Sequence, residues 1–137
     1  LYYLSYGEGT VSTIGAFVNP LLCWGGLLAL PVLAYRAVKR DRTALFILVG
    51  YLAQVLPWVF ISRLTFEYHY FAATLFLVLA LGYVFDRLRR RGYLGIVYAF
   101  TAANGVLFAL FFPVLTGVTI PRDYAWNVLK WLPDWPF

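Results

Sequence analysis

The sequence is poor in charge, since Asp, Glu, Lys and Arg together make up 12% of its 137 residues. A soluble domain carries about 25% charged residues, and a disordered segment combines high charge with low hydrophobicity. Hydrophobic residues make up 63% of this chain. The composition therefore disfavours both a soluble globular domain and a disordered segment.

Methionine is absent, and cysteine occurs once, as Cys23. One cysteine cannot form an internal disulfide, and a metal site built from several cysteines is excluded. The sequence shows no signal peptide, no P-loop and no HExxH or GxSxG motif. Because the chain begins at Leu1 and contains no methionine, we expect it to be a piece of a longer protein.

The sequence instead contains four long uncharged windows, at residues 9–35, 43–62, 68–85 and 92–121. Each reaches or approaches the ~20 residues that cross ~30 Å of hydrocarbon as a helix, and none alternates in polarity as a barrel strand does. We predict an all-α, polytopic membrane fold with a single four-helix transmembrane domain over 1–137. Its helices are expected at about residues 20–35, 43–61, 70–85 and 92–115.

The ends of two helices carry recognisable signals. Asn19 suits the N-cap position of the first span, and Pro20 suits its first helical position. The tail at 117–137 is expected to lie at the outer membrane interface. Within it, Asp123 is expected to cap a short helix over 124–132, whose apolar residues fall on one face.

The orientation follows from the basic residues. Eight of the eleven Lys and Arg lie in two alternate connections, 36–42 and 86–92. The positive-inside rule places both connections in the cytoplasm, so both chain ends and the 62–69 loop are expected on the outer or lumenal side. The net charge of +5 is then explained by topology and by contact with membrane lipids, and no nucleic-acid partner is expected.

The polar groups of the outer side concentrate in the loop before the third span (RLTFEYHYF, 63–71). Arg63 is suited to bind a phosphate, and His69 is suited to donate to a phosphate or a sugar hydroxyl. Tyr68 and Tyr70 are suited to hydrogen-bond or stack on a sugar. The alternative is structural: an Arg63–Glu67 pair and interfacial aromatic residues that hold a turn.

Three segments resemble the carboxy-terminal membrane region of protein O-mannosyltransferases. They are VSTIGAFVNPLLCWGG at 11–26, LPWVFISRLTFEYHYF at 56–71, and WLPDWPF at 131–137. They occur in the right order between correctly oriented spans, and the resemblance covers essentially the whole chain. It implies a membrane fold of the GT-C type.

The resemblance also implies a function. Members transfer mannose from a polyprenyl-phosphate carrier to Ser or Thr of exported proteins, on the outer face of the plasma membrane in bacteria or in the endoplasmic reticulum in eukaryotes. Arg63, Tyr68, His69 and Tyr70 are the residues expected to contact the phosphate or sugar of the mannose donor. Asn19 and Glu67 are expected to support these residues without contacting the donor themselves.

The catalytic acidic pair of the family lies in its first external loop, which this chain does not contain. The resemblance therefore implies a supporting role: the chain helps form the lipid groove and the rim of an active site completed by the N-terminal half of the same enzyme. No catalytic residue, metal ligand or cofactor is assigned here, although some members use a divalent metal. Two alternatives stay open, namely a GT-C glycosyltransferase with another acceptor and a non-enzymatic membrane scaffold.

Overall fold

A computed structural model of the chain describes residues 2–6, 9–14, 18–60 and 70–129. The chain forms two compact units, Val18–Asn104 on the one hand and Leu1–Phe17 with Gly105–Phe137 on the other. The single domain expected over 1–137 stays a prediction.

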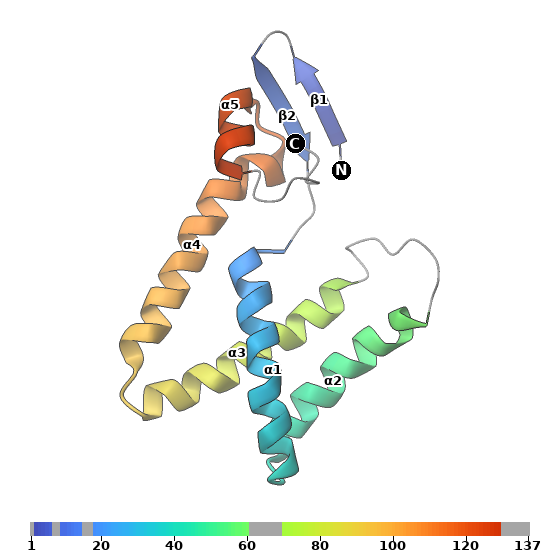
Figure 1. Cartoon of the computed structure of the whole chain (residues 1–137), viewed down its shortest axis with the longest axis vertical. Coiled ribbons are helices and arrows are strands. Elements are labelled where there is room, and N and C mark those ends of the chain that lie inside the picture. Colours follow the sequence, from blue (N-terminus) through green and yellow to red (C-terminus); the bar gives the residue numbers. More distant parts are fainter. Residues whose placement is uncertain (1, 7–8, 15–17, 61–69, 130–137) are drawn as a thin grey trace. The chain divides into compact units, whose positions relative to one another are not determined.

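In the unit Val18–Asn104, the described residues are mainly helical. The unit contains α1 (Pro20–Val38), α2 (Arg42–Val59), α3 (Phe71–Arg90) and the first turns of α4 (Leu94–Thr116). Helix α1 packs against both α2 and α3, and α2 packs against α3 (Figure 1). In the part of the chain that the structure describes, these four helices are long and apolar enough to cross a membrane.

Small residues bring the first three helices together. One buried cluster consists of Ala29, Leu33, Ala44, Ile47 and Ala80, and the next consists of Tyr51, Ala73 and Leu77. Small side chains at such contacts let helix backbones approach closely, which is how helices pack where lipid removes the usual hydrophobic drive.

The outward faces of the helices are apolar as well. Leu28 of α1 is 74% exposed and Phe46 of α2 is 68% exposed. A helix that is apolar on every side suits a membrane span, because its outer face meets hydrocarbon instead of water.

Helix α3 extends five residues beyond its expected end at 85, to Arg90. Asp86 forms ion pairs one turn further on with Arg89 (3.2 Å) and Arg90 (2.8 Å). Such pairs support a helix, and arginines in the last turn interact favourably with its dipole. Much of the basic connection predicted at 86–92 is therefore helical.

The other helices differ less from the expected bounds. Helix α1 continues to Val38 and so includes Arg36, while α2 begins one residue early and ends at Val59. Helix α4 begins at Leu94, after Gly92 takes a φ of +86° in the connection. It continues past Pro113 for three residues before it ends at Thr116.

Two N-caps set the starts of α1 and α2. The oxygen of the Asn19 side chain accepts from the backbone N–H groups of Leu21 (3.0 Å) and Leu22 (3.4 Å), so the cap predicted there is confirmed. Asp41 caps α2 in the same way, through the N–H groups of Thr43 and Ala44. The Asp41 cap was not predicted, although aspartate is one of the preferred residues at this position.

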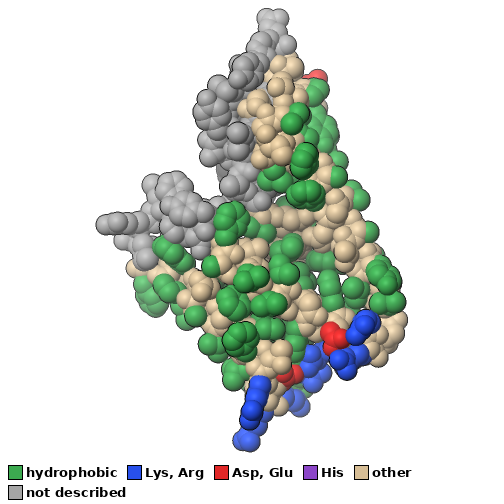
Figure 2. Space-filling view, turned by 180° about the vertical axis from the view of Figure 1, so that it is seen from behind, with side chains coloured by type: hydrophobic (Ala, Val, Ile, Leu, Met, Phe, Trp, Pro, Cys, Tyr) green, Lys and Arg blue, Asp and Glu red, His purple; other side chains and the backbone are tan. Residues whose placement is uncertain are grey.

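Lys and Arg side chains gather at the end of this unit where α1 and α3 finish and α2 begins (Figure 2). We call it the basic end. Here the second carboxylate oxygen of Asp41 accepts from the Tyr83 hydroxyl (2.6 Å) and from the Arg87 guanidinium (2.7 Å). The same carboxylate therefore caps α2 and joins it to α3.

The other unit contains a small antiparallel sheet that the sequence analysis did not predict. Strand β1 (Tyr2–Tyr6) pairs with β2 (Thr10–Ile14), with Tyr2 opposite Ile14, and β2 pairs with the short β3 (Ile120–Pro121). The Ser12 hydroxyl donates to the Gly117 carbonyl (2.7 Å), which ties the hairpin to the segment after α4.

The described tail continues from β3 as one short helical segment, α5 (Arg122–Tyr124) followed by the π-helical η2 (Ala125–Leu129). The expected cap at Asp123 is wrong: Pro121 holds the N-cap position, without a side-chain hydrogen bond. The Arg122 N–H instead donates to the Gly9 carbonyl (2.9 Å), so backbone pairing with the hairpin sets the start of the helix. Residues 130–137, which include the WLPDWPF segment, lie outside the described residues.

Candidate functional site

Most of the predicted site falls outside the described residues. Arg63, Glu67, Tyr68 and His69 belong to the segment 61–69, which the structure does not describe. Their contacts with a phosphate or a sugar stay predictions. Tyr70 and Asn19 are described, and both lie at helix starts.

Tyr70 joins α3 to α2 at the point where the predicted loop enters the helix. Its hydroxyl lies 2.9 Å from the hydroxyl of Tyr51, which is 7% exposed. Its carbonyl accepts from the Thr74 hydroxyl one turn into α3 (3.2 Å). Burial and the Tyr51 hydrogen bond raise the pKa of Tyr70, so the phenol stays neutral.

This geometry lets Tyr70 brace the start of α3, while its expected contact with the phosphate or sugar of the mannose donor stays a prediction. A hydroxyl has one hydrogen to donate and can accept as well, and the bond to Tyr51 uses one of these roles. That bond holds the tyrosine against α2 and so positions the start of α3 next to the predicted loop.

Asn19 uses both ends of its side-chain amide within the chain. Its oxygen caps α1, and its nitrogen donates to the Asn104 carbonyl of α4 (3.0 Å). The residue therefore joins the start of α1 to the middle of α4. The supporting role expected of Asn19 at the donor site stays a prediction.

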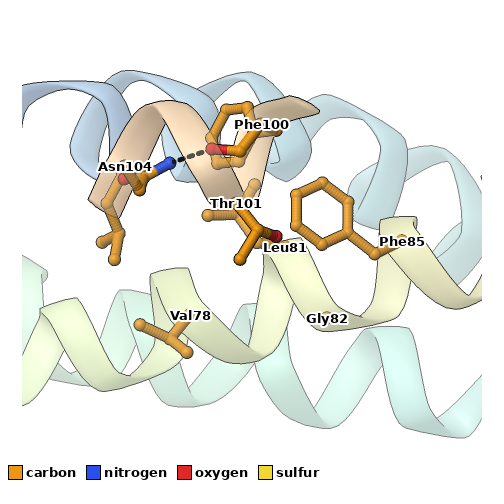
Figure 3. A pocket seen from close by; sticks show the side chains of 8 residues that line it. Val78, Leu81, Gly82, Phe85, Phe100, Thr101 and Asn104 are labelled. Atoms are coloured by element: carbon orange, nitrogen blue, oxygen red, sulfur yellow. Dashed lines mark hydrogen bonds between the residues drawn. The ribbon is translucent and has the colours of Figure 1, made fainter. Parts of the chain in front are cut away.

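An apolar groove lies between α1, α3 and α4 (Figure 3). Its volume is about 300 Å³, and its lining consists of Leu22, Val78, Leu81, Gly82, Phe85, Phe100, Thr101 and Asn104. Val78, Gly82 and Phe85 follow one another along α3, opposite Phe100, Thr101 and Asn104 of α4. We call this site the lipid-facing groove.

Aromatic packing between α3 and α4 forms part of the groove wall. The rings of Phe85 and Phe100 meet edge to face, with centroids 5.2 Å apart and an interplanar angle of 71°. Phe100 also fills the space beside Gly25, where a Cβ would come within 2.6 Å of the ring. A side chain at position 25 would therefore displace Phe100 from its place in the groove wall.

Polar atoms in the groove are few. The Asn104 side chain donates to the Phe100 carbonyl (2.9 Å), and the Thr101 hydroxyl donates to the Val97 carbonyl (2.8 Å). The Asn104 side-chain oxygen is buried and accepts no hydrogen bond from the described residues. A groove of this kind can hold a hydrocarbon chain and one hydrogen-bond donor, and no described carboxylate lies in it.

Sequence reasoning missed the groove, because its lining comes from three separate stretches of the chain. The first, at Leu22, lies more than fifty residues before the second, which begins at Val78. Among the described residues, no group of three His, Cys, Asp or Glu side chains is placed to hold a metal ion.

Residues 33–135 match the family described as the C-terminal four-transmembrane region of protein O-mannosyltransferase. The chain belongs to this protein O-mannosyltransferase family. The predicted all-α, multi-pass membrane fold is thereby confirmed, and so is the resemblance on which it rested.

Curated relatives give the same result. A polyprenol-phosphate-mannose–protein mannosyltransferase of Mycobacterium tuberculosis is 37% identical over 132 residues, which covers 85% of this chain and 24% of that protein. The protein of the same name from Mycolicibacterium smegmatis is 32% identical over 125 residues, covering 79% of this chain and 23% of that protein. The dolichyl-phosphate-mannose–protein mannosyltransferase 3 of Saccharomyces cerevisiae is 31% identical over 111 residues, covering 72% of this chain and 14% of that protein.

The chain thus spans about a quarter of the length of the bacterial mannosyltransferases it matches. It corresponds to the C-terminal four-transmembrane region of that family. No solved structure gives a significant match.

Proposed function

We propose that this domain serves an enzyme that transfers mannose from a polyprenyl-phosphate carrier to Ser or Thr hydroxyls of exported proteins. The match of residues 33–135 to the C-terminal four-helix region of the family carries the proposal. The relatives named for polyprenol- or dolichyl-phosphate-mannose and for a protein acceptor supply the substrate classes.

Within that enzyme, the domain binds the lipid part of the mannose donor. The lipid-facing groove is apolar, opens between membrane-spanning helices and is of a size suited to a stretch of prenyl chain. Arg63, Tyr68, His69 and Tyr70 contact the phosphate or the sugar, while Asn19 and Glu67 support them. The proposal assigns no cofactor, no metal ligand and no general base to this domain.

The proposed orientation puts the basic end in the cytoplasm. Both chain ends and the 61–69 segment then face the outer or lumenal side, which is the plasma membrane exterior if the source is bacterial. This places the predicted phosphate-binding residues on the side where exported proteins are modified.

The predicted phosphate contacts can be tested by substitution in the full-length enzyme. Arg63→Ala or His69→Ala should slow transfer of mannose to a Ser/Thr peptide by roughly ten- to a hundredfold, because a hydrogen bond to a charged group contributes about 1.5–3 kcal/mol. Arg40→Ala removes the same charge at the basic end and should leave the rate unchanged. Normal rates in both Arg63→Ala and His69→Ala would contradict the assignment.

The groove can be tested separately through Gly82. A Cβ at this position meets nothing within 4 Å, and Gly82 lines the groove, so Gly82→Leu is expected to place its side chain in the groove. We expect KM for the mannose donor to rise by about tenfold, since the loss of two buried methylenes costs about 1.6 kcal/mol. The matched variant Gly95→Leu on α4 also has open space around its Cβ and lies outside the groove.

A mannose donor with a single short prenyl unit distinguishes a blocked groove from a misfolded Gly82→Leu enzyme. Gly82→Leu should use this short donor as well as wild type does. Equal KM values for the long donor in Gly82→Leu and Gly95→Leu would show that the groove does not hold the prenyl chain. An acceptor screen that found mannose on a lipid or a glycan, and none on protein, would favour the GT-C enzyme with another acceptor.

A further inference from the structure

A second pocket lies at the basic end, between the last turns of α1 and α3. Its volume is about 290 Å³. Its lining includes three arginines, Arg36, Arg87 and Arg91, and three aliphatic residues, Val32, Val84 and Leu88. The pocket therefore combines a cationic rim with an apolar wall, and we call it the arginine pocket.

The charges around this pocket do not cancel. Arg87 is held by Asp41 at 2.7 Å and stacks on the Tyr83 ring at 3.7 Å from its centroid. Asp86, the other described carboxylate at this end, pairs with Arg89 and Arg90.

Two guanidiniums remain for a ligand. Among the described residues, neither Arg36 nor Arg91 has a carboxylate within ion-pair distance. Each presents up to five N–H donors in a planar fork, which suits phosphate oxygens.

The position of the pocket indicates which phosphate it takes. It lies where the apolar helices end and basic residues begin. For helices that span a bilayer, this is the level at which lipid head groups are expected. The apolar wall continues into the exposed apolar faces of the helices, so a ligand with both a phosphate and acyl chains fits better than a free phosphate ion.

The arginine pocket is distinct from the proposed site for the phosphate of the mannose donor. Tyr70 precedes α3 and Arg91 follows it, and α3 has 20 residues. At 1.5 Å per residue these ends are about 30 Å apart, which is the thickness of the hydrocarbon core. The arginine pocket and Tyr70, which follows the predicted phosphate-binding loop in the sequence, therefore lie at opposite ends of α3.

We propose that the arginine pocket binds the head group of an anionic phospholipid. Arg36 and Arg91 donate to its phosphate, Arg87 is held beside them by Asp41, and the glycerol and first methylenes lie against Val32, Val84 and Leu88. The bound lipid joins α1 to α3 at the basic end. This inference is independent of the proposed enzymatic function.

The test uses purified full-length protein in detergent, titrated with dioleoylphosphatidylglycerol and followed by native mass spectrometry. The double variant R36Q/R91Q should weaken binding of this lipid by at least about tenfold, since it removes two charge-assisted contacts. The matched control R40Q/R42Q loses the same two charges at the same end but does not line the pocket, and it should bind like wild type.

Lipid identity is tested with two further probes. Wild type should retain dioleoylphosphatidylcholine at least about tenfold less well than the anionic lipid if net charge selects the ligand. Undecaprenyl phosphate should bind R36Q/R91Q and wild type equally, because its phosphate belongs to the opposite end.

Several outcomes would overturn the proposal. They are equal phosphatidylglycerol binding in the two double variants, equal retention of phosphatidylcholine and phosphatidylglycerol by wild type, and a loss in R36Q/R91Q confined to undecaprenyl phosphate. If R36Q/R91Q does not fold, R36K/R91K replaces it. That variant keeps both charges but loses the planar fork, so unchanged phosphatidylglycerol binding by it would equally overturn the assignment.

Discussion

Asp41 shows how much a single residue can organise at the end of a membrane helix bundle. One of its oxygens caps α2, and the other accepts from Tyr83 and Arg87 on α3. The Tyr83 hydroxyl, the Ala44 N–H and the Arg87 guanidinium together hold the pKa of Asp41 below its ordinary value of 3.8. The ionised carboxylate is therefore the form that stabilises the fold.

The lowered pKa of Asp41 predicts a specific pH dependence. Its contribution to stability is fully present above pH 3.8 and is lost as the pH falls through the lower, folded-state pKa. The melting temperatures of wild-type and Asp41→Asn full-length protein in detergent should differ at pH 7 and converge below pH 3.8. Asparagine keeps the N-cap, so Asp41→Ala should melt lower still. A difference between wild type and Asp41→Asn that stays constant down to pH 3 would contradict this account.

The Tyr51–Tyr70 pair gives a second prediction for individual residues. Tyr51→Phe or Tyr70→Phe alone leaves one partly buried hydroxyl without its partner, which should cost about 1–3 kcal/mol of unfolding free energy. The double variant should cost less than the sum of the two, with a coupling of about 0.5–3 kcal/mol in a double-mutant cycle. Tyr98→Phe serves as the control, because Tyr98 is 66% exposed. Additive effects would mean that the two hydroxyls do not interact.

Among the helices, α1 and α3 are held together by a close approach at Gly26. A Cβ added to Gly26 would lie 2.7 Å from the Cβ of Leu77, which is fully buried. The neighbouring atom is close to the α3 backbone and cannot move aside as the tip of a flexible side chain would. Glycine at this position therefore allows the contact between the two helices.

This contact predicts the effect of a single methyl group. Gly26→Ala should destabilise the protein by about 1–3 kcal/mol, since overpacking forces the helices apart. Gly95→Ala should not destabilise it, because a Cβ there meets nothing within 4 Å and alanine favours helix. Chemical unfolding of the two full-length variants side by side provides the measurement. A Gly26→Ala protein as stable as Gly95→Ala would show that α1 and α3 are not in close contact.

For the molecule as a whole, the alternation of basic and non-basic connections predicts how the chain lies in its membrane. Single cysteines in a cysteine-free full-length protein test this orientation. Val118→Cys should react with a membrane-impermeant maleimide in intact cells, whereas Arg40→Cys should react only after permeabilisation. Both positions are exposed at the surface of their units, so neither is shielded by packing. The reverse pattern would place the basic end outside and would contradict the proposed function.

Helix ends and the sheet show where sequence reasoning was incomplete. The loss of hydropathy predicts an end of α3 at 85, whereas Asp86 and the arginines after it continue the helix through their own ion pairs. The hairpin β1–β2 had a readable signal, since two runs rich in tyrosine, threonine and aliphatic residues flank a glycine-containing turn. The signal was overlooked because hydropathy windows favour long apolar segments.

The family and the predicted loop residues came from local segments of the sequence, and the family was confirmed by the match over 33–135. The roles of Arg63, Tyr68 and His69 stay predictions. The pairing of Tyr70 with Tyr51 and that of Asn19 with Asn104 required the fold, since their partners are 19 and 85 residues away.

The sequence by itself determined the four spans, their number and the side on which the basic residues collect, because hydropathy and charge act along a short stretch of chain. Only the tertiary structure decided where the lipid-facing groove and the arginine pocket lie. Each is lined by residues from different helices, such as Leu22 with Asn104 and Arg36 with Arg91. Helices α1 and α3 approach closely at Gly26, and Asp41 holds Arg87 of the arginine pocket; these contacts are not visible in any single segment.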